Sequence, residues 1–416
     1  MQTRLAEEFS GDAAAADAAA IVGRCVHCGF CTATCPTYQV LGDELDGPRG
    51  RIHLMQQMLE GETPSAATRL HLDRCLGCRA CETTCPSGVE YGRLLDFGRD
   101  LVEHKVPRGA RETLARRALA LVLTGPVFSP LLRIGQLLRP LLPLRWRTRI
   151  PLRRARGAWP ATAHARKILL LGGCVHDALS PDIHAAAARV FDRLGITLQV
   201  VPAAGCCGAI RHHLSESGGA LHDMRRNVDA WWPHVEAGAE AILSLASGCG
   251  PMLRDYGHLL RNDPAYAARA AQIAQLTRDA ADLLPAFGTR LKELLPPAPP
   301  EKVAFHAPCS LQHGLKLRGT VENLLQLLGA ELTAVPAAPQ CCGSAGTYSL
   351  LQPELSTTLG RAKAAALGSA NPQLILSANV GCIVQLAAFS EIPVMHWIEW
   401  LDARLGGMTA AGQSVQ

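Results

Sequence analysis

The stretch RCVHCGFCTATCP, from Arg24 to Pro36, places four cysteines within eleven residues, and RCLGCRACETTCP, from Arg74 to Pro86, nearly repeats it. Both follow the spacing C-x2-C-x2-C-x3-C-P, which is the ferredoxin pattern for a [4Fe–4S] cluster. In this pattern three cysteines ligate one cluster, while the fourth cysteine usually ligates the other cluster. We therefore expect two clusters, one held by Cys25, Cys28, Cys31 and Cys85, the other by Cys75, Cys78, Cys81 and Cys35.

Zinc bound by four thiolates is the alternative for each of these runs. Zinc ligands typically come as two CxxC pairs separated by a dozen residues or more, whereas here four cysteines share one short run. The spacing therefore favours iron and sulfide. Two neighbouring clusters would carry single electrons between a donor and an acceptor. No flavin or nicotinamide fingerprint occurs elsewhere in the sequence, so we expect the donor on another protein.

The composition of the whole chain indicates a folded protein of a reducing compartment. It has 416 residues, of which 48% are hydrophobic and 19% charged, enough for two or three domains. Sixteen cysteines are too few, at this length, for a disulfide-stapled secreted scaffold. The N-terminal residues lack a basic start followed by an apolar stretch, so we expect no secretory signal and a cytoplasmic location. No window approaches eighteen uninterrupted apolar residues, so we expect no transmembrane helix.

Positive charge is concentrated between Leu101 and Arg156, where thirteen Lys and Arg residues accompany two Glu residues, although the whole chain carries only +5. Because this charge is local, we expect no nucleic-acid partner. Prolines divide the region into short segments, which predicts a basic helical linker over residues 101–163. One interpretation is an amphipathic anchor at a membrane surface, with Trp146 and Trp159 near its end. The favoured interpretation is a packed linker whose arginines contact an acidic partner subunit.

From Lys167 onward, short β-type runs alternate with helical stretches, and this region is duplicated. The segments KILLLGGC, VVPAAGCCG and AILSLASGC of the first copy match KVAFHAPC, AVPAAPQCCG and LILSANVGC of the second. In both copies 31 residues separate the first cysteine from the Cys-Cys pair, and the Pro-rich run LLPPAPPEK lies between the copies. The sequence thus predicts a multidomain α+β protein: an α-helical ferredoxin domain over residues 1–100, then the linker, then tandem α/β domains over 164–295 and 300–416.

The two copies contain the other eight cysteines, each set following β-type runs. Ligands bind at the carboxyl ends of strands in open α/β sheets, so we expect two similar sites facing each other across a pseudo-twofold axis. Adjacent thiols can both reach one polynuclear centre, which favours an iron–sulfur centre, with zinc or plain buried thiols as alternatives. The candidate ligands are Cys174, Cys206, Cys207 and Cys249 in the first copy, and Cys309, Cys341, Cys342 and Cys382 in the second.

Several other polar residues lie near these cysteines. Arg49 and Arg51 lie between the two ferredoxin runs. Either they form hydrogen bonds near a cluster or dock a flavoprotein, or they belong to the solvated start of a helix. Because thiols already supply the expected ligands, we do not expect the histidines nearest to them, His27, His176 and His306, to bind metal. His212 and His213 are expected at the surface or in the wall of a site.

With these motifs in view, nearly the whole chain resembles the iron–sulfur subunits of glycolate oxidase (glycolate dehydrogenase). The most specific segments are CVHCGFCTATCPTY, LGDELDGPRGRI and CETTCPSGVEYGRLLDFGRD. The duplicated half resembles the cysteine-rich CCG domains of heterodisulfide reductases and of lactate-utilisation iron–sulfur proteins. The resemblance implies that FAD-containing dehydrogenase subunits oxidise glycolate to glyoxylate. This chain would then pass their electrons toward the quinone pool, either in the cytoplasm or peripherally on the inner face of the cell membrane.

The duplicated half departs from this pattern at one position. In heterodisulfide reductase-like proteins the motif ends in CxxC, whereas Met252 and Gln385 stand where the last cysteine would be. Each CCG site is therefore short of one thiolate, which argues against a non-cubane cluster and against disulfide reduction. Three alternatives remain: a subunit of a lactate or other 2-hydroxy acid dehydrogenase complex, a heterodisulfide reductase-like catalytic subunit, and a zinc-stabilised scaffold in which only the N-terminal clusters transfer electrons.

Overall fold

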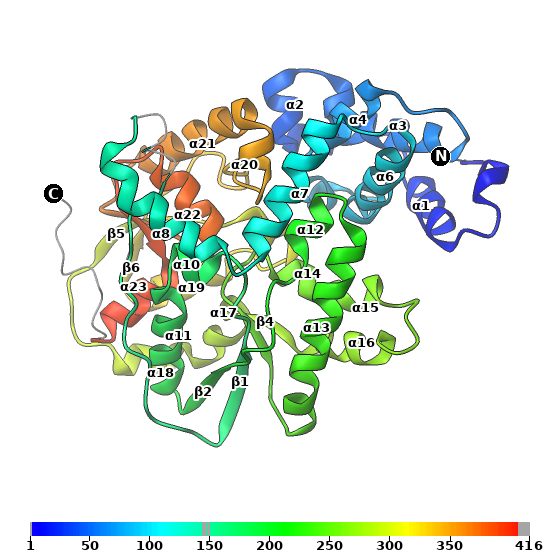
Figure 1. The fold of residues 1–416 in the computed structure, drawn as a ribbon. Coiled ribbons are helices and arrows are strands. Elements are labelled where there is room, and N and C mark those ends of the chain that lie inside the picture. Colours follow the sequence, from blue (N-terminus) through cyan, green and yellow to red (C-terminus); the bar gives the residue numbers. More distant parts are fainter. Residues whose placement is uncertain (1, 144–146, 148–149, 407–416) are drawn as a thin grey trace.

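The computed structural model describes residues 2–143, 147 and 150–406, and the predicted fold class is confirmed. A helical N-terminal part lies across one end of two α/β units (Figure 1). Its α-helices are α1 (Ala13–Gly23), α2 (Pro36–Leu41), α3 (Pro48–Leu59), α4 (Ala66–Asp73), α5 (Ala80–Thr84) and α6 (Tyr91–Lys105). Short 3-10 turns η1 (Glu7–Phe9), η2 (Thr32–Thr34) and η3 (Glu44–Asp46) lie between them.

Local sequence explains where these helices begin. The Asp12 side chain accepts hydrogen bonds from the backbone amides of Ala14 and Ala15 and so caps α1. Pro36 and Pro48 occupy the start of α2 and α3. The first residue of a helix donates no hydrogen bond within that helix, so the N–H that proline lacks is not needed there. Because Pro36 also closes the first cysteine run, α2 begins directly after that run.

The core of the N-terminal part consists of aliphatic and methionine side chains between α1, α3, α4 and α6. Met55, Leu72 and Leu94 are fully buried there. Gly98 on α6 lets α3 approach closely, because a Cβ at this position would lie 2.4 Å from the sulfur of Met55. This core supports the loops that carry the cysteines.

The linker contains α7 (Ala110–Thr124), α8 (Phe128–Leu138) and the 3-10 turn η4 (Arg139–Leu141). Pro126 lies between α7 and α8, so the helical stretch breaks where a proline predicts a break. The start of α7 is held to the N-terminal part, because Arg108 and Arg116 both pair with Asp73, at 2.6 and 3.3 Å. In contrast, α8 has no buried residue. Trp146 lies outside the described residues.

Among the described residues, no single helix is both long enough and apolar enough to cross a membrane. The segments Ala110–Thr124 and Phe128–Leu141 meet the length and composition test only together, as a pair bent by 94°.

Each α/β unit contains a four-stranded parallel sheet. The first consists of β1 (Arg166–Leu170), β2 (Ile196–Val200), β3 (Ile242–Ser244) and β4 (Thr277–Asp279), in the order β2-β1-β3-β4. The second consists of β5 (Glu301–His306), β6 (Ala330–Leu332), β7 (Leu374–Ser377) and β8 (Val394–His396), in the order β6-β5-β7-β8. The two orders are equivalent, so the internal duplication seen in the sequence extends to the topology.

Helices cover both sheets, as the continuous apolar runs of buried parallel strands require. In the first unit they are α10 (His176–Leu179), α11 (Asp182–Asp192), α12 (Ala209–His213), α13 (Ser217–Glu236), α14 (Gly250–Arg254), α15 (Tyr256–Leu259), α16 (Ala267–Leu276), α17 (Ala280–Leu283), η5 (Leu284–Phe287) and α18 (Gly288–Leu294). In the second they are η6 (Ser310–Gly314), α19 (Thr320–Leu327), α20 (Tyr348–Leu351), α21 (Pro353–Gly368), α22 (Val380–Ala387) and α23 (Trp397–Arg404).

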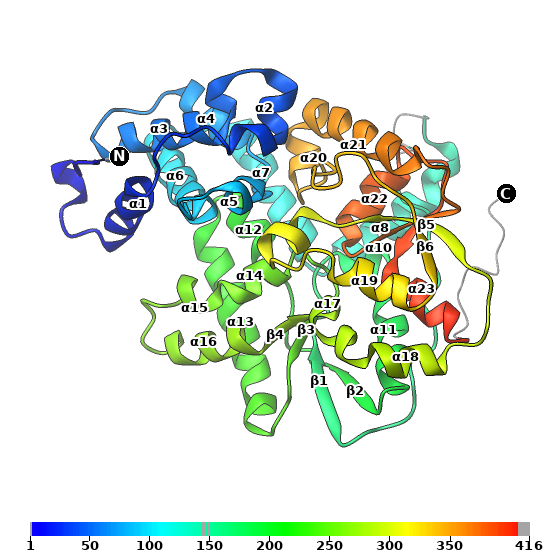
Figure 2. The same cartoon turned by 180° about the vertical axis from the view of Figure 1, so that it is seen from behind.

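The two α/β units share one apolar core, which includes residues of both sheets. Helix α11 packs against α23, where Arg189 lies 2.6 Å from Asp402 (Figure 2). At the carboxyl ends of the strands, the Ser247 backbone amide donates to the Ala378 carbonyl at 3.2 Å. The Ser247 and Ser310 hydroxyls are 2.9 Å apart. These contacts bring the cysteine-bearing loops of both units to a common edge.

The N-terminal part lies over this edge and contacts both units. Arg79 pairs with Asp255 of the first unit at 2.9 Å. The Tyr348 hydroxyl of the second unit donates to the backbone carbonyl of Arg74 at 3.0 Å. Because Arg74 and Arg79 belong to the second ferredoxin run, this run faces the CCG loops.

Candidate electron-transfer and metal sites

Cys25, Cys28, Cys31 and Cys85, which we call the first ferredoxin set, line one small cavity. Burial raises the pKa of Cys31 to about 11, and the nearby thiols of the other three cysteines contribute. The loop turns tightly through Gly29, whose φ of +83° favours glycine. The structure therefore brings Cys85 from the second run to the first, which is the grouping that the ferredoxin spacing predicts.

The second ferredoxin set consists of Cys75, Cys78, Cys81 and Cys35. Burial raises the pKa of Cys81 well above its usual value, and the other three thiols lie close enough to contribute. Polar groups point at Cys75: the Gly77 amide donates to its sulfur at 3.4 Å and the Tyr91 hydroxyl at 3.8 Å. Such hydrogen bonds stabilise a thiolate and so suit a cluster ligand.

The two ferredoxin sets differ in exposure. Cys28 of the first set is exposed, and its neighbours Val26 and Phe30 are 67% and 60% exposed. In the second set, Cys78 packs against an apolar cluster that contains Leu76 and Tyr348, and Cys309 of the second α/β unit packs against the same cluster. The first set therefore lies at the protein surface, while the second faces the CCG loops.

Arg49 and Arg51 have separate environments. Arg51 is fully buried: its Nε donates to the His71 carbonyl at 2.7 Å, and its Nη2 lies 3.4 Å from Asp46. Burial opposes its charged form, but the pKa of Arg51 is still raised because Cys75, Tyr91 and Cys35 lie close. A solvated helix start is therefore wrong for Arg51, which places a buried positive charge beside the second ferredoxin set. Arg49 is partly exposed and pairs with Glu44 at 2.7 Å.

The first CCG site is a chain of four thiols, in which Cys206 interacts with Cys174 and Cys207, and Cys207 with Cys249. Hydrogen bonds from Cys174 and Cys207 lower the pKa of Cys206. The Gly208 amide donates to the Cys206 sulfur at 3.4 Å.

The second CCG site repeats this chain. The sulfurs of Cys309 and Cys341 are 3.7 Å apart, and Cys342 interacts with both Cys341 and Cys382. The Gly343 amide donates to the Cys341 sulfur at 3.4 Å, and Asn379 donates to Cys382 at 3.5 Å. Both CCG sites therefore gather their four cysteines, with the same backbone amide aimed at the first thiol of the pair.

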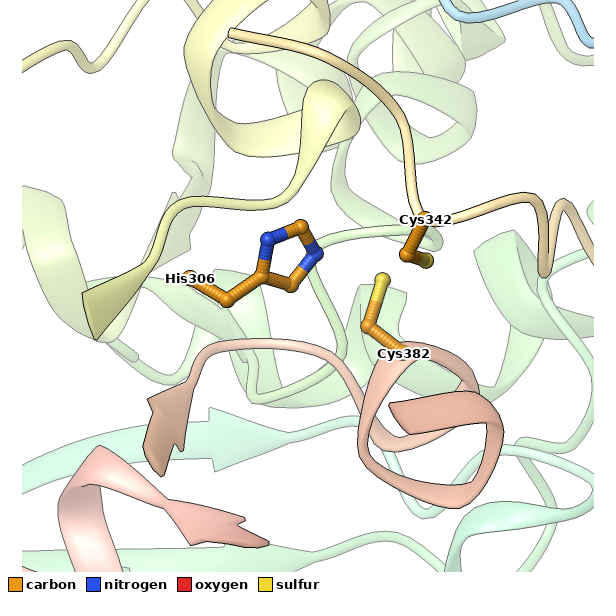
Figure 3. Close-up of side chains that lie close together, drawn as sticks. All are labelled: His306, Cys342 and Cys382. Carbon is orange, nitrogen blue, oxygen red and sulfur yellow. The ribbon is translucent and has the colours of Figure 1, made fainter. Parts of the chain in front are cut away.

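The second site also contains a histidine that the sequence did not lead us to expect. One ring nitrogen of His306 and the sulfurs of Cys342 and Cys382 all lie within 4.8 Å of one another, and all three residues are buried (Figure 3). The only sequence signal was its place three residues before Cys309, where the first copy has Leu171. Among the other histidines, His27 is exposed and His176 lines a large cavity. His212 and His213 line the wall of the same cavity, which is one of the two positions that the sequence predicts for them.

This cavity, of about 1020 Å³, joins the sites. Its lining includes Cys78 of the second ferredoxin set and residues of both CCG sites, among them Cys174, Cys249, Cys309 and Cys382. The two sites, which we expected to face each other, thus open into one shared cavity. Residues of the N-terminal part line a further wall of this cavity.

Met252 and Gln385, at the positions of the missing cysteines, do not act as substitutes. Met252 is buried in the apolar core of the first unit. The Gln385 amide turns away from the thiols and donates to the backbone carbonyl and hydroxyl of Ser356, at 3.1 and 2.9 Å. Neither residue replaces the lost thiolate.

Comparison with known proteins agrees with this architecture. Residues 21–89 match the family described as 4Fe-4S dicluster domain, and residues 168–254 and 303–387 each match the cysteine-rich domain family. The glycolate oxidase iron–sulfur subunit of Escherichia coli K12 is 50% identical over 407 residues, covering 97% of this chain and 99% of that protein. The chain belongs to the family of glycolate oxidase iron–sulfur subunits.

More distant relatives match a smaller share of the chain or at lower identity. The probable glycolate oxidase iron–sulfur subunit of Bacillus subtilis is 30% identical and covers 87% of each chain. Lactate utilization protein A of Bacillus velezensis is 28% identical, over 57% of this chain and all of that protein. The glycolate family is therefore supported over nearly the full length, and the lactate proteins are similar only distantly.

Proposed function

We propose that this chain is the electron-transfer subunit of a complex that oxidises glycolate to glyoxylate. FAD-containing partner subunits carry out that oxidation, and quinone accepts the electrons. When bound, two [4Fe–4S] clusters supply one-electron transfer. The single observation that carries the proposal is the exchange of Cys35 and Cys85 between the two ferredoxin sets, which gives each set four neighbouring thiols.

The contacts of the two sets support a direction for the electrons. The first ferredoxin set lies at the surface, where exposed Val26 and Phe30 flank Cys28 and offer an apolar contact for the flavin subunit. The second set is buried against the shared cavity, which is large enough for a small apolar acceptor. Electrons would thus enter at the first set and leave through the second.

Co-purification tests this assignment. A tagged chain is isolated anaerobically with its partners, and iron, flavin and glycolate-dependent reduction of a quinone analogue are measured together. We expect flavin in the partner subunits and about eight iron atoms in this chain. Isolation with a lactate-oxidising flavoprotein, and turnover with lactate but not glycolate, would contradict the substrate.

We further propose a peripheral position on the inner face of the cell membrane, through the exposed surface of α7 and α8. This linker surface combines exposed apolar residues with exposed arginines: Leu114, Leu121, Leu131, Ile134, Leu137, Leu141, Arg111, Arg117 and Arg133. Arginines alone would suit an acidic partner protein, but leucines interspersed with arginines suit the boundary of anionic lipid. Delivery of electrons to quinone would benefit from this position.

A further inference from the structure

We propose that the second CCG site is a mononuclear zinc site in which His306 joins Cys342 and Cys382, and that the first CCG site has no counterpart of it. The proposal goes beyond electron transfer through the ferredoxin sets, because it assigns a different metal to different residues. Zinc has no redox chemistry of its own, so its role here is structural.

The spacing of the donor atoms fits a single ion. Zinc–sulfur and zinc–nitrogen bonds of about 2.3 and 2.0 Å place tetrahedral ligand atoms roughly 3.5–4 Å apart. The His306 nitrogen and the two sulfurs already lie within 4.8 Å of one another before any ion draws them together. No three thiols of either ferredoxin set, all of them described residues, lie this close, as expected for thiols on separate corners of a cube.

The imidazole of His306 has no other partner in the described part of the chain. The residue is 1% exposed, and both of its ring nitrogens are buried without a hydrogen bond. A buried polar group left unpaired costs about 1–3 kcal/mol, so such groups usually have a partner. His396, equally buried, differs: its Nε2 lies 3.1 Å from the Leu245 carbonyl oxygen, and its Nδ1 accepts from the Ile398 amide.

The side chain of His306 points at the sulfurs and not at solvent. Figure 3 shows the ring edge facing Cys342 and Cys382 from the end of β5. Burial lowers the pKa of His306 well below its usual value, and the nearby Lys363 acts in the same direction. A buried imidazole aimed at two thiols has the placement that a metal ligand requires.

The two CCG sites are inequivalent at this position. Leu171 occupies the place of His306 in the first copy, and among the described residues no histidine forms such a close group with the thiols of the first site. In the second site, His306 supplies the donor that Gln385 does not, since the Gln385 amide bonds with Ser356. Cys341, which interacts with Cys342, is the thiol we expect at the fourth position.

The charge of the surroundings suits this ligand set. A zinc ion with three thiolates and one neutral imidazole carries a net charge of −1. Lys363 is buried beside the site, and its Nζ donates to the carbonyls of Ala337 and Ala338 at 3.2 and 2.8 Å. The thiols of Cys342, Cys341 and Cys382 lie close enough to raise its pKa, against the stronger effect of burial. The amino group of Lys363 thus lies near the thiols that would bind the ion.

Metal analysis of the full chain, purified anaerobically with its partners, tests the proposal. We expect His306→Ala to lose one zinc per chain while iron and sulfide stay unchanged. Gln385→Ala, a control beside the site but directed away from it, should retain that zinc. His306→Cys restores a donor atom, so this variant should bind the zinc again. It also keeps the test valid if His306→Ala does not fold.

X-ray absorption at the zinc edge of the wild-type chain gives a second readout, independent of turnover. We expect mixed sulfur and nitrogen ligands, changing to sulfur alone in His306→Cys. Retention of zinc in His306→Ala, or an all-sulfur spectrum in the wild-type chain, would overturn the proposal. So would iron beyond the two ferredoxin clusters that disappears in His306→Ala. Failure of the electron-transfer assignment would instead appear as missing iron and sulfide, with the zinc result unaffected.

Discussion

Arg51 shows best how a single residue connects the fold to electron transfer. Its guanidinium is buried between Asp46 and the second ferredoxin set, so it holds the loop and places a positive charge near the thiols. A positive charge favours the reduced, more negative state of a cluster. We therefore expect Arg51→Gln to lower the midpoint potential of the second cluster by roughly 50–100 mV, since unit charges several Å apart interact by about 2 kcal/mol at an effective dielectric of about 20.

A redox titration followed by electron paramagnetic resonance measures this shift. Arg49→Gln is the matched control, because Arg49 is partly exposed and solvent screens its charge. Equal shifts in the two variants would contradict the role of Arg51. We also expect Arg51→Gln to lower the free energy of unfolding, because Asp46 loses part of its buried ion pairing.

Cys28 allows a direct test of the entry point at the same scale. As the exposed member of the first ferredoxin set, it lies nearest to any flavin subunit that docks there. In Cys28→Ala we expect glycolate still to reduce the flavin of the complex, while electron delivery to a quinone analogue is lost. Stopped-flow absorbance separates the two steps. Unimpaired turnover in this variant would argue strongly against electron entry through the first set.

At the scale of elements, the glycine of each CCG loop lets the chain turn around the thiols. Gly343 has a φ of +80°, and a Cβ there would lie 2.7 Å from the Ser356 carbonyl oxygen. Gly319 has a similar φ of +73° but nothing within 4 Å. We expect Gly319→Ala to cost about 1 kcal/mol through backbone strain alone, and Gly343→Ala to cost clearly more. Chemical denaturation measures both, and equal losses of stability would show that the close contact at Gly343 is unimportant.

The exposed segment formed by α8 and η4 gives the prediction for the linker. Leu137 and Leu141 are 75% and 82% exposed, next to arginines on the same linker surface. We expect the double variant Leu137→Glu/Leu141→Glu to lose most of its binding to vesicles containing anionic lipid in a co-sedimentation assay. Leu327→Glu, at an exposed leucine of α19 outside the linker surface, is the control. Unchanged vesicle binding together with loss of a partner subunit would favour a protein contact instead.

Most elements were predictable because their causes are local. Proline spacing predicted that the linker is broken, and the repeated CCG segments predicted two equivalent sheets. The environment of Arg51 was not predictable, because its partners Asp46, His71 and Cys75 come together only through the packing of α3 and α4. The proximity of His306 to Cys342 and Cys382 was missed for the same reason, since His306 ends β5 while the two cysteines follow β6 and β7.

At the scale of the whole molecule, the arrangement places four cysteine sets along one path. The first ferredoxin set is at the surface, the second is buried, and the two CCG sites line the cavity beyond it. The sequence could predict each set, because spacing within a motif is a local property. It could not predict that Cys78 and Cys309 pack against one apolar cluster, because this depends on how the N-terminal part sits on the second unit.

The central claim is that the two ferredoxin sets hold [4Fe–4S] clusters that exchange single electrons. Iron and acid-labile sulfide are measured on the anaerobically purified chain, followed by electron paramagnetic resonance after reduction with dithionite. We expect about eight iron and eight sulfide per chain, with the signals of two magnetically coupled clusters. A colourless protein without sulfide and without a paramagnetic signal would contradict the account.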